Sequence, residues 1–176
     1  MTDLRIGPLV GAGLTLGVGL GGFVDGIALH QILQWHNMLS SVMPPVDLVA
    51  MKYNMVWDGA FHALTWCVCA VGVVLLFRAG RRTDVRWSGA ILGGSMLGGW
   101  GLFNFVEGLI DHQLLGIHHV HPGPMQEAWD WVFVLVGGGV FMLVGYAIVR
   151  SARAGNADRD RQRVLEASRH VPPARR

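Results

Sequence analysis

The sequence predicts an all-α membrane protein with four transmembrane helices, which we expect to form a tandem repeat of two helical hairpins. Charged residues make up only 15% of its 176 residues, and its mean hydropathy is +0.41. A soluble domain carries about 25% charged residues. Four apolar stretches, at 8–35, 55–77, 88–116 and 129–149, are each long enough to cross a hydrocarbon core of about 30 Å.

A repeated motif relates the first apolar stretch to the third. Phe-Val-Asp-Gly-Ile-Ala-Leu-His-Gln-Ile-Leu-Gln-Trp-His at 23–36 returns as Phe-Val-Glu-Gly-Leu-Ile-Asp-His-Gln-Leu-Leu-Gly-Ile-His at 105–118. A Trp-Asp pair also opens the second and the fourth stretches, at 57–58 and 129–130. The chain is therefore predicted to contain two hairpins of the same direction, related by a pseudo-two-fold axis along the membrane normal.

The basic residues indicate how the chain is oriented. With four spans, the N-terminus, the middle loop and the C-terminal tail share one side. That side holds 13 of the 14 Lys and Arg and is predicted to be cytoplasmic, because the outer loops at 36–54 and 117–128 carry only Lys52. We divide the chain into a four-helix transmembrane bundle at 1–150 and an Arg-rich cytoplasmic tail at 151–176, which we expect to contact anionic lipid rather than nucleic acid.

Glycines recur at four-residue intervals in the inner parts of the first and third stretches, as at Gly13, Gly17 and Gly21. Small residues at this spacing let two helix backbones approach closely in lipid. The pattern predicts that the first and third spans pack against each other.

Polar residues of all four stretches fall at similar depths in the outer half of the membrane. With a rise of about 1.5 Å per residue, His30 lies about 9 Å and Asp25 about 16 Å below the outer boundary. The layer contains no Lys or Arg, and its members are Asp25, Asp58, Glu107, Asp111 and Asp130 with His30, His62 and His112. Ionised carboxylates at this density require cations, protons or protonated imidazoles around them.

Mixed carboxylate and imidazole ligation is typical of Zn, Fe, Mn and Cu sites, so the layer predicts a transition-metal site. The expected ligands are His30, Asp58, His62, Glu107, Asp111 and His112. Residues expected to support these ligands, or to lie at the outer rim, are Asp25, Asp130, His36, His118 and His119. On a regular α-helix Asp58 and His62 share a face, whereas Asp25 and His30 are about 140° apart and are not expected to share an ion.

The two copies of the motif are unequal at two polar positions. His62 corresponds to Val134, and Asp111 corresponds to Leu29. A di-metal redox centre with unlike metal positions fits this inequality. A haem b held by His30 and His112 fits less well, because haem ligation leaves the acids without a role.

Three segments of the chain resemble a family of bacterial membrane proteins known as domain of unknown function 2243. The segments are 23–36, 54–62 and 104–119. The resemblance extends to about residue 150 and implies a multi-pass protein of the bacterial inner membrane. It implies no activity.

Three functions fit these features. The first is a metal-dependent membrane protein, in one form an oxidoreductase, whose centre opens to the outer side. The second is a metal capture, transport or metallochaperone protein, although the inner half of the spans has no comparable polar cluster. The third is a structural or assembly subunit with a hydrogen-bonded polar core. The expected partners are the lipid bilayer and a second copy or another membrane subunit, and no nucleic acid.

Overall fold

A computed structural model describes residues 4–169 of the chain, so part of the predicted tail, 170–176, lies outside the described residues. Helices account for most of this range, and the described residues form no strand beyond one isolated bridge between Arg5 and Val85. In chain order the elements are α1 (Gly7–Val24), η1 (Asp25–Ile32), α2 (Leu48–Gly80), α3 (Gly89–Glu107), η2 (Gly108–Leu114), α4 (Gln126–Val132), η3 (Phe133–Val140) and α5 (Phe141–Arg169).

Four helical stretches are long and apolar enough to cross a membrane, which confirms the predicted number of spans. They are Gly7–Ile32, Leu48–Gly80, Gly89–Leu114 and Gln126–Gln162. The last stretch contains most of α5, and this helix continues without a break to Arg169. The residues after 149 are rich in Arg and Ala, which favour helix, so the beginning of the predicted tail is a continuation of the fourth helix.

The helices η1, η2 and η3 are π-helical, with hydrogen bonds that reach one residue further than in an α-helix. Two of them form the C-terminal ends of the first and third spans, and η3 interrupts the fourth span. The second span, α2, is an uninterrupted α-helix that begins at Leu48. Asp47 caps it, because its carboxylate accepts hydrogen bonds from the backbone N–H groups of Val49 and Ala50.

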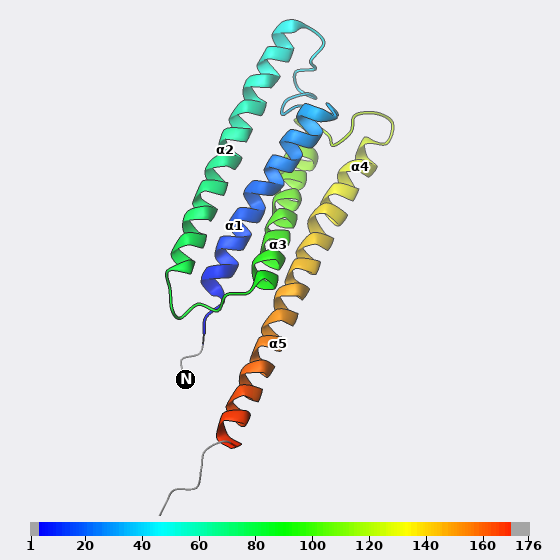
Figure 1. Ribbon diagram of the computed structural model, residues 1–176. Coiled ribbons are helices and arrows are strands. Elements are labelled where there is room, and N and C mark those ends of the chain that lie inside the picture. Colours follow the sequence, from blue (N-terminus) through cyan, green and yellow to red (C-terminus); the bar gives the residue numbers. More distant parts are fainter. Residues whose placement is uncertain (1–3, 170–176) are drawn as a thin grey trace, which may run out of the picture.

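Helices α1 and α3 form the centre of the molecule, with α2 packed against α1 and α5 packed against α3 (Figure 1). The central pair meets through glycine, as predicted. A Cβ atom on Gly17 would collide with the backbone oxygen of Met96, and one on Gly99 would collide with the backbone oxygen of Leu14. The two backbones are therefore as close as a pair of helices can come, and no side chain fits between them at these positions.

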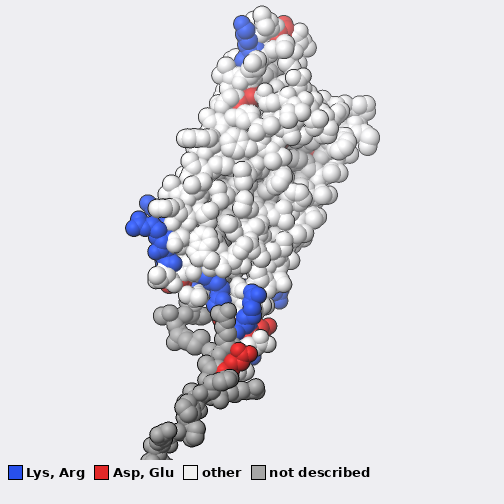
Figure 2. All heavy atoms as spheres, viewed as in Figure 1, with Lys and Arg blue, Asp and Glu red and all other residues white. Residues whose placement is uncertain are grey.

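The first described residues, the middle loop and α5 meet at one end of the molecule. The backbone N–H of Arg5 donates to the carbonyl of Asp84 at 2.8 Å, and that of Arg86 donates to the carbonyl of Arg5 at 3.0 Å. The guanidinium of Arg86 forms an ion pair with Asp160 of α5. Most Lys and Arg side chains visible in Figure 2 gather at this end, separated from the opposite end by an uncharged band.

The outward faces of α2 and α5 are apolar and uncovered. Leu64 and Trp66 on α2, and Leu143 and Tyr146 on α5, each expose more than three fifths of their surface. Exposed apolar surface on this scale is unfavourable in water and is expected where helices face lipid tails. Helices α2 and α5 therefore supply most of the surface that is expected to face lipid.

We predict that Gly17→Ala lowers the thermal stability of the purified protein, with a cost of about 1–3 kcal/mol from overpacking the contact with α3. Gly11→Ala on the same helix is the matched control, because a Cβ atom there meets no other atom within 4 Å. Tryptophan-fluorescence melting in detergent measures both variants. Equal melting temperatures would show that the glycine contact does not hold α1 against α3.

Candidate metal centre

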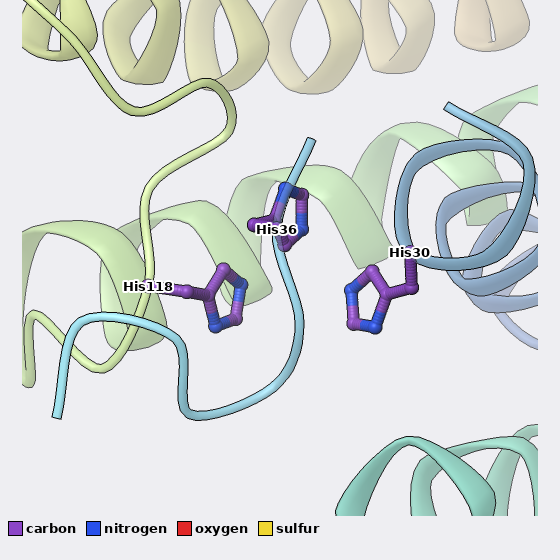
Figure 3. Close-up of side chains that lie close together, drawn as sticks. All are labelled: His30, His36 and His118. Carbon is purple, nitrogen blue, oxygen red and sulfur yellow. The ribbon is translucent and has the colours of Figure 1, made fainter. Parts of the chain in front are cut away.

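Four buried imidazoles lie together at the C-terminal ends of the first and third spans, opposite the basic end. We call His30, His36, His112 and His118 the four-histidine cluster. The ring centroids of His30 and His36 are 4.5 Å apart, those of His36 and His118 are 4.6 Å apart, and those of His112 and His118 are 4.8 Å apart. Figure 3 shows three of the four rings, on a helix and two separate loops, pointing toward one another.

The π-helical segments bring an acid and a histidine of each span together. The Asp25 carboxylate lies 3.1 Å from Nε2 of His30, and the Glu107 carboxylate lies 3.0 Å from Nε2 of His112. Both pairs are five residues apart. Residues at this spacing diverge on an α-helix and align where the turn widens to a π-helix. The prediction that Asp25 and His30 point apart is therefore wrong, because it assumed a regular α-helix.

A reversal of the chain returns the next histidine of each motif to the interior. After η1, Gln34 adopts a left-handed backbone conformation (φ 51°), and after η2, Gly116 does the same (φ 56°). The chain turns back there instead of continuing outward, which buries His36 and His118 to 3% and 1% exposure. Both were candidates for the outer rim, and the structure instead places them in the middle of the cluster.

Backbone carbonyls fix the orientation of these two rings. Nδ1 of His36 donates to the carbonyl of Val120 at 2.8 Å, and Nδ1 of His118 donates to the carbonyl of Met38 at 3.1 Å. A carbonyl can only accept, so Nδ1 carries the proton in both rings and Nε2 of each neutral ring presents a lone pair. Metal-binding histidines are usually oriented in this way, by a hydrogen bond from the other ring nitrogen.

His36 stays neutral at ordinary pH. Burial lowers its pKa from the usual 6.5 to about 3, and the neighbouring His118 and His30 contribute to the same shift. Its Nε2 has no hydrogen-bond partner among the described residues. A buried imidazole lone pair without a donor is the group that a metal ion would need, since a histidine must be deprotonated at the ligating nitrogen to bind.

Two aspartates support the cluster from α2 and α4. Asp58 accepts hydrogen bonds from Nδ1 of His30 at 3.0 Å, from the amide of Asn37 at 2.7 Å and from the backbone N–H of Met38 at 2.9 Å. The amide of Gln31 donates to it as well, at 3.4 Å, so with four donors around it this carboxylate is satisfied as a hydrogen-bond acceptor. It orients His30 and holds the outer loop, so its role is that of a support for the cluster.

Asp130 has the corresponding position next to His112. It accepts from His119 at 2.6 Å and from the backbone N–H of Val120 at 2.9 Å. Its distance to Nδ1 of His112 is 3.6 Å, too long for a hydrogen bond. Asp130 therefore connects the loop at 117–125 to the fourth span. Neither ring nitrogen of His112 makes a hydrogen bond with a described residue.

Two groups of three side chains could each hold a metal ion. One consists of His30, His36 and His118, the other of Glu107, His112 and His118, and within each group the ligand atoms lie within 4.8 Å of one another. Glu107 is closest to two nitrogens at once, at 3.0 Å from Nε2 of His112 and 2.9 Å from Nε2 of His118. A carboxylate oxygen that faces an imidazole lone pair is stable only when a positive ion lies between them, either a proton or a metal ion.

Besides Asp58, two of the expected ligands belong to neither group. Nδ1 of His62 bonds to the backbone carbonyl of Asp58 on its own helix at 2.7 Å, and its Nε2 faces Gly26. Asp111 is partly exposed and belongs to neither group. The two are the polar positions at which the repeated motif differs, whereas His30, His36, His112 and His118 recur in both copies. Identity between the copies was the signal in the sequence that marked the central residues.

The rings of His36 and His118 leave no gap between His30 and His112 for a haem. His36 contacts both of those rings, with centroids at 4.5 and 6.3 Å, and His118 contacts both at 5.9 and 4.8 Å. A porphyrin between His30 and His112 would have to displace both. The cluster suits a bare ion better than a macrocycle.

The chain is a multi-pass membrane protein of the all-helical class, with buried histidine and carboxylate groups that could hold a metal ion. It belongs to the family described as "Predicted membrane protein" and known as domain of unknown function 2243, whose model matches residues 12–152. This match confirms the resemblance seen in the sequence. No curated protein and no solved structure matches the chain.

We predict that Asp58→Ala destabilises the protein by at least about 2 kcal/mol, because buried donors of His30, Asn37 and Met38 lose their acceptor. Asp47→Ala on the same helix removes only an exposed N-terminal cap and should cost about 1 kcal/mol. Thermal melting of both variants in detergent measures the difference. A smaller loss for Asp58→Ala than for Asp47→Ala would contradict the assigned role.

Proposed function

We propose that this protein is an integral membrane protein that binds a transition-metal ion in the four-histidine cluster, near the outer face of the membrane. Fe, Cu, Zn and Mn all accept mixed imidazole and carboxylate ligands, so the class of ion is open among these four. An oxidoreductase activity at a redox-active ion is the more specific form of the proposal.

The observation that carries the proposal is the direction of the ring nitrogens. The Nδ1 atoms of His30, His36 and His118 are held by Asp58, Val120 and Met38. Their Nε2 atoms are left for the interior, which contains the carboxylates of Asp25 and Glu107. Such a group of acceptors with no Lys or Arg among them has the composition of a ligand set rather than of an ordinary polar core.

We also propose that the chain consists of two duplicated hairpins. The hydrogen bonds from His36 to Val120 and from His118 to Met38 join positions that correspond, 82 residues apart, in the repeated motif. The collisions predicted for Gly17 with Met96 and for Gly99 with Leu14 follow the same offset. Reciprocal contacts of this kind support a pseudo-two-fold relation between the halves.

The proposed orientation places both termini in the cytoplasm of a bacterium, with the protein in its inner membrane. The end that carries Arg5, Arg86 and the helix of Asp160 is the basic end, and Lys52 lies near the opposite end. Under the positive-inside bias this leaves the four-histidine cluster facing the outer side.

A resident ion fits better than an ion in transit. Toward the basic end, the hydroxyls of Thr15, Thr65 and Ser95 each bond to a backbone carbonyl of their own helix. Hydroxyls satisfied within their own helix provide no continuous set of ligands for a cation. Transport or metallochaperone activity is therefore the weaker alternative.

The structural alternative is a protonated, hydrogen-bonded polar core without metal. The contacts of His30 with Asp25 and Asp58 would suit an imidazolium between two carboxylates. The same explanation does not extend to His36, whose Nε2 has no carboxylate partner.

We predict that the purified wild-type protein contains stoichiometric Fe, Cu, Zn or Mn, and that His118→Ala loses most of it because both ligand groups include His118. The matched control is His121→Ala, since His121 packs against Trp35 and Trp129 and belongs to neither group. Elemental analysis of protein purified without chelator measures the content. Wild-type protein free of these metals, after reconstitution as well, would reject the proposed function.

We predict that alkaline phosphatase fused after residue 169 is inactive in bacterial cells and that the same enzyme inserted after Val46 in the first outer loop is active. The fusion after 169 follows the basic end, and Val46 lies in the loop before α2. Phosphatase activity requires export, so the two fusions report opposite sides. The reverse pattern would invert the proposed topology.

A further inference from the structure

Asp25 and Glu107 occupy corresponding positions in the two halves but differ by one methylene group. Both are buried, and each lies against the histidine five residues further on. Their reach beyond that histidine differs. Glu107 also contacts Nε2 of His118, whereas Nε2 of His36, the corresponding atom in the first half, has no partner.

The shared residue His118 can serve only one ion. Its Nδ1 is engaged by the carbonyl of Met38, so only Nε2 is available, and an imidazole with one available nitrogen cannot bridge two metals. The two candidate groups, which both require His118, are therefore alternatives. An ion is expected to bind the group whose ligand atoms are placed closer together and neutralise its charge better.

The second-half group is the more complete set. Glu107 holds one carboxylate oxygen 3.0 Å from Nε2 of His112 and 2.9 Å from Nε2 of His118, separations close to those between ligand atoms around one tetrahedral metal. The other group, of His30, His36 and His118, has three imidazoles and no carboxylate among its members. A divalent ion in low dielectric is better neutralised by the group with the carboxylate.

We infer that one ion binds to Glu107, His112 and His118, and that the shorter Asp25 prevents the corresponding set in the first half from binding a second ion. This inference rests on the proposed function, and it explains the number of bound ions by the length of the Asp25 side chain. Asp25 thus determines stoichiometry, and His36 remains an unused ligand beside the occupied site.

The reciprocal substitutions test the inference. Asp25→Glu lengthens the first-half carboxylate so that it can reach both His30 and His36, and it should raise the stoichiometry from one ion to two. Glu107→Asp shortens the second-half carboxylate and should weaken binding about tenfold or more. Asp47→Glu is the control, because it makes the same chemical change at an exposed helix cap outside the cluster.

The measurement uses full-length protein in detergent, stripped with chelator and titrated with Co²⁺. Equilibrium dialysis gives the stoichiometry, and the visible d–d absorption reports ligation by nitrogen and oxygen. Thermal melting of each variant verifies that it is folded. If Asp25→Glu does not fold, Glu107→Asp decides the matter alone, since it removes volume instead of adding it.

Failure of this inference differs from failure of the proposed function. Two ions in the wild type, or one ion with unchanged affinity in folded Glu107→Asp, would overturn the inference while metal binding stands. A folded Asp25→Glu that still binds one ion would also overturn it. No Co²⁺ binding by any folded variant, the wild type included, would reject the proposed function itself.

Discussion

The structure depends on one electrostatic constraint, which is that buried carboxylates and imidazoles in a membrane span must be neutralised where they lie. Asp25, Asp58, Glu107 and Asp130 are all buried, and each is in contact with at least one histidine. An uncompensated charge at this depth would cost several kcal/mol, so the acids and the histidines have to be brought together before the outer half of the protein is stable. The local backbone follows from this requirement.

The π-helical ends of the first and third spans are the clearest example. An α-helical turn would point Asp25 and His30 in different directions, and the wider turn aligns them at the expense of regular hydrogen bonding. The close glycine contact between α1 and α3 belongs to the same design, because two spans whose backbones touch bring their polar ends within reach of each other. The packing of α1 against α3 and the chemistry of the four-histidine cluster are thus parts of one arrangement.

Much of this architecture could be predicted from the sequence, and the details of the site could not. Hydropathy gave four spans, and glycine spacing gave the contact between the first and third. The sequence could not indicate that Asp25 and His30 meet, since residue spacing was converted to angles with the α-helical period. Nor could it indicate that His36 turns inward, because that reversal depends on left-handed backbone at Gln34, a residue type that rarely adopts it. The corresponding reversal before His118 is at Gly116, a residue type that adopts this conformation readily. Differences between the two copies drew attention to His62 and Asp111, whereas the cluster is built from the histidines that the copies share.

The crossed carbonyl contacts also constrain how the protein is made. His36 is oriented by Val120, which follows the third span, and His118 is oriented by Met38, which precedes the second. The first half therefore leaves the ribosome with His36 unanchored, although His30 already has Asp58 as its partner, and the cluster can close only after the third span has entered the bilayer. The four-histidine cluster therefore forms late in biogenesis, after both halves of the chain have been inserted.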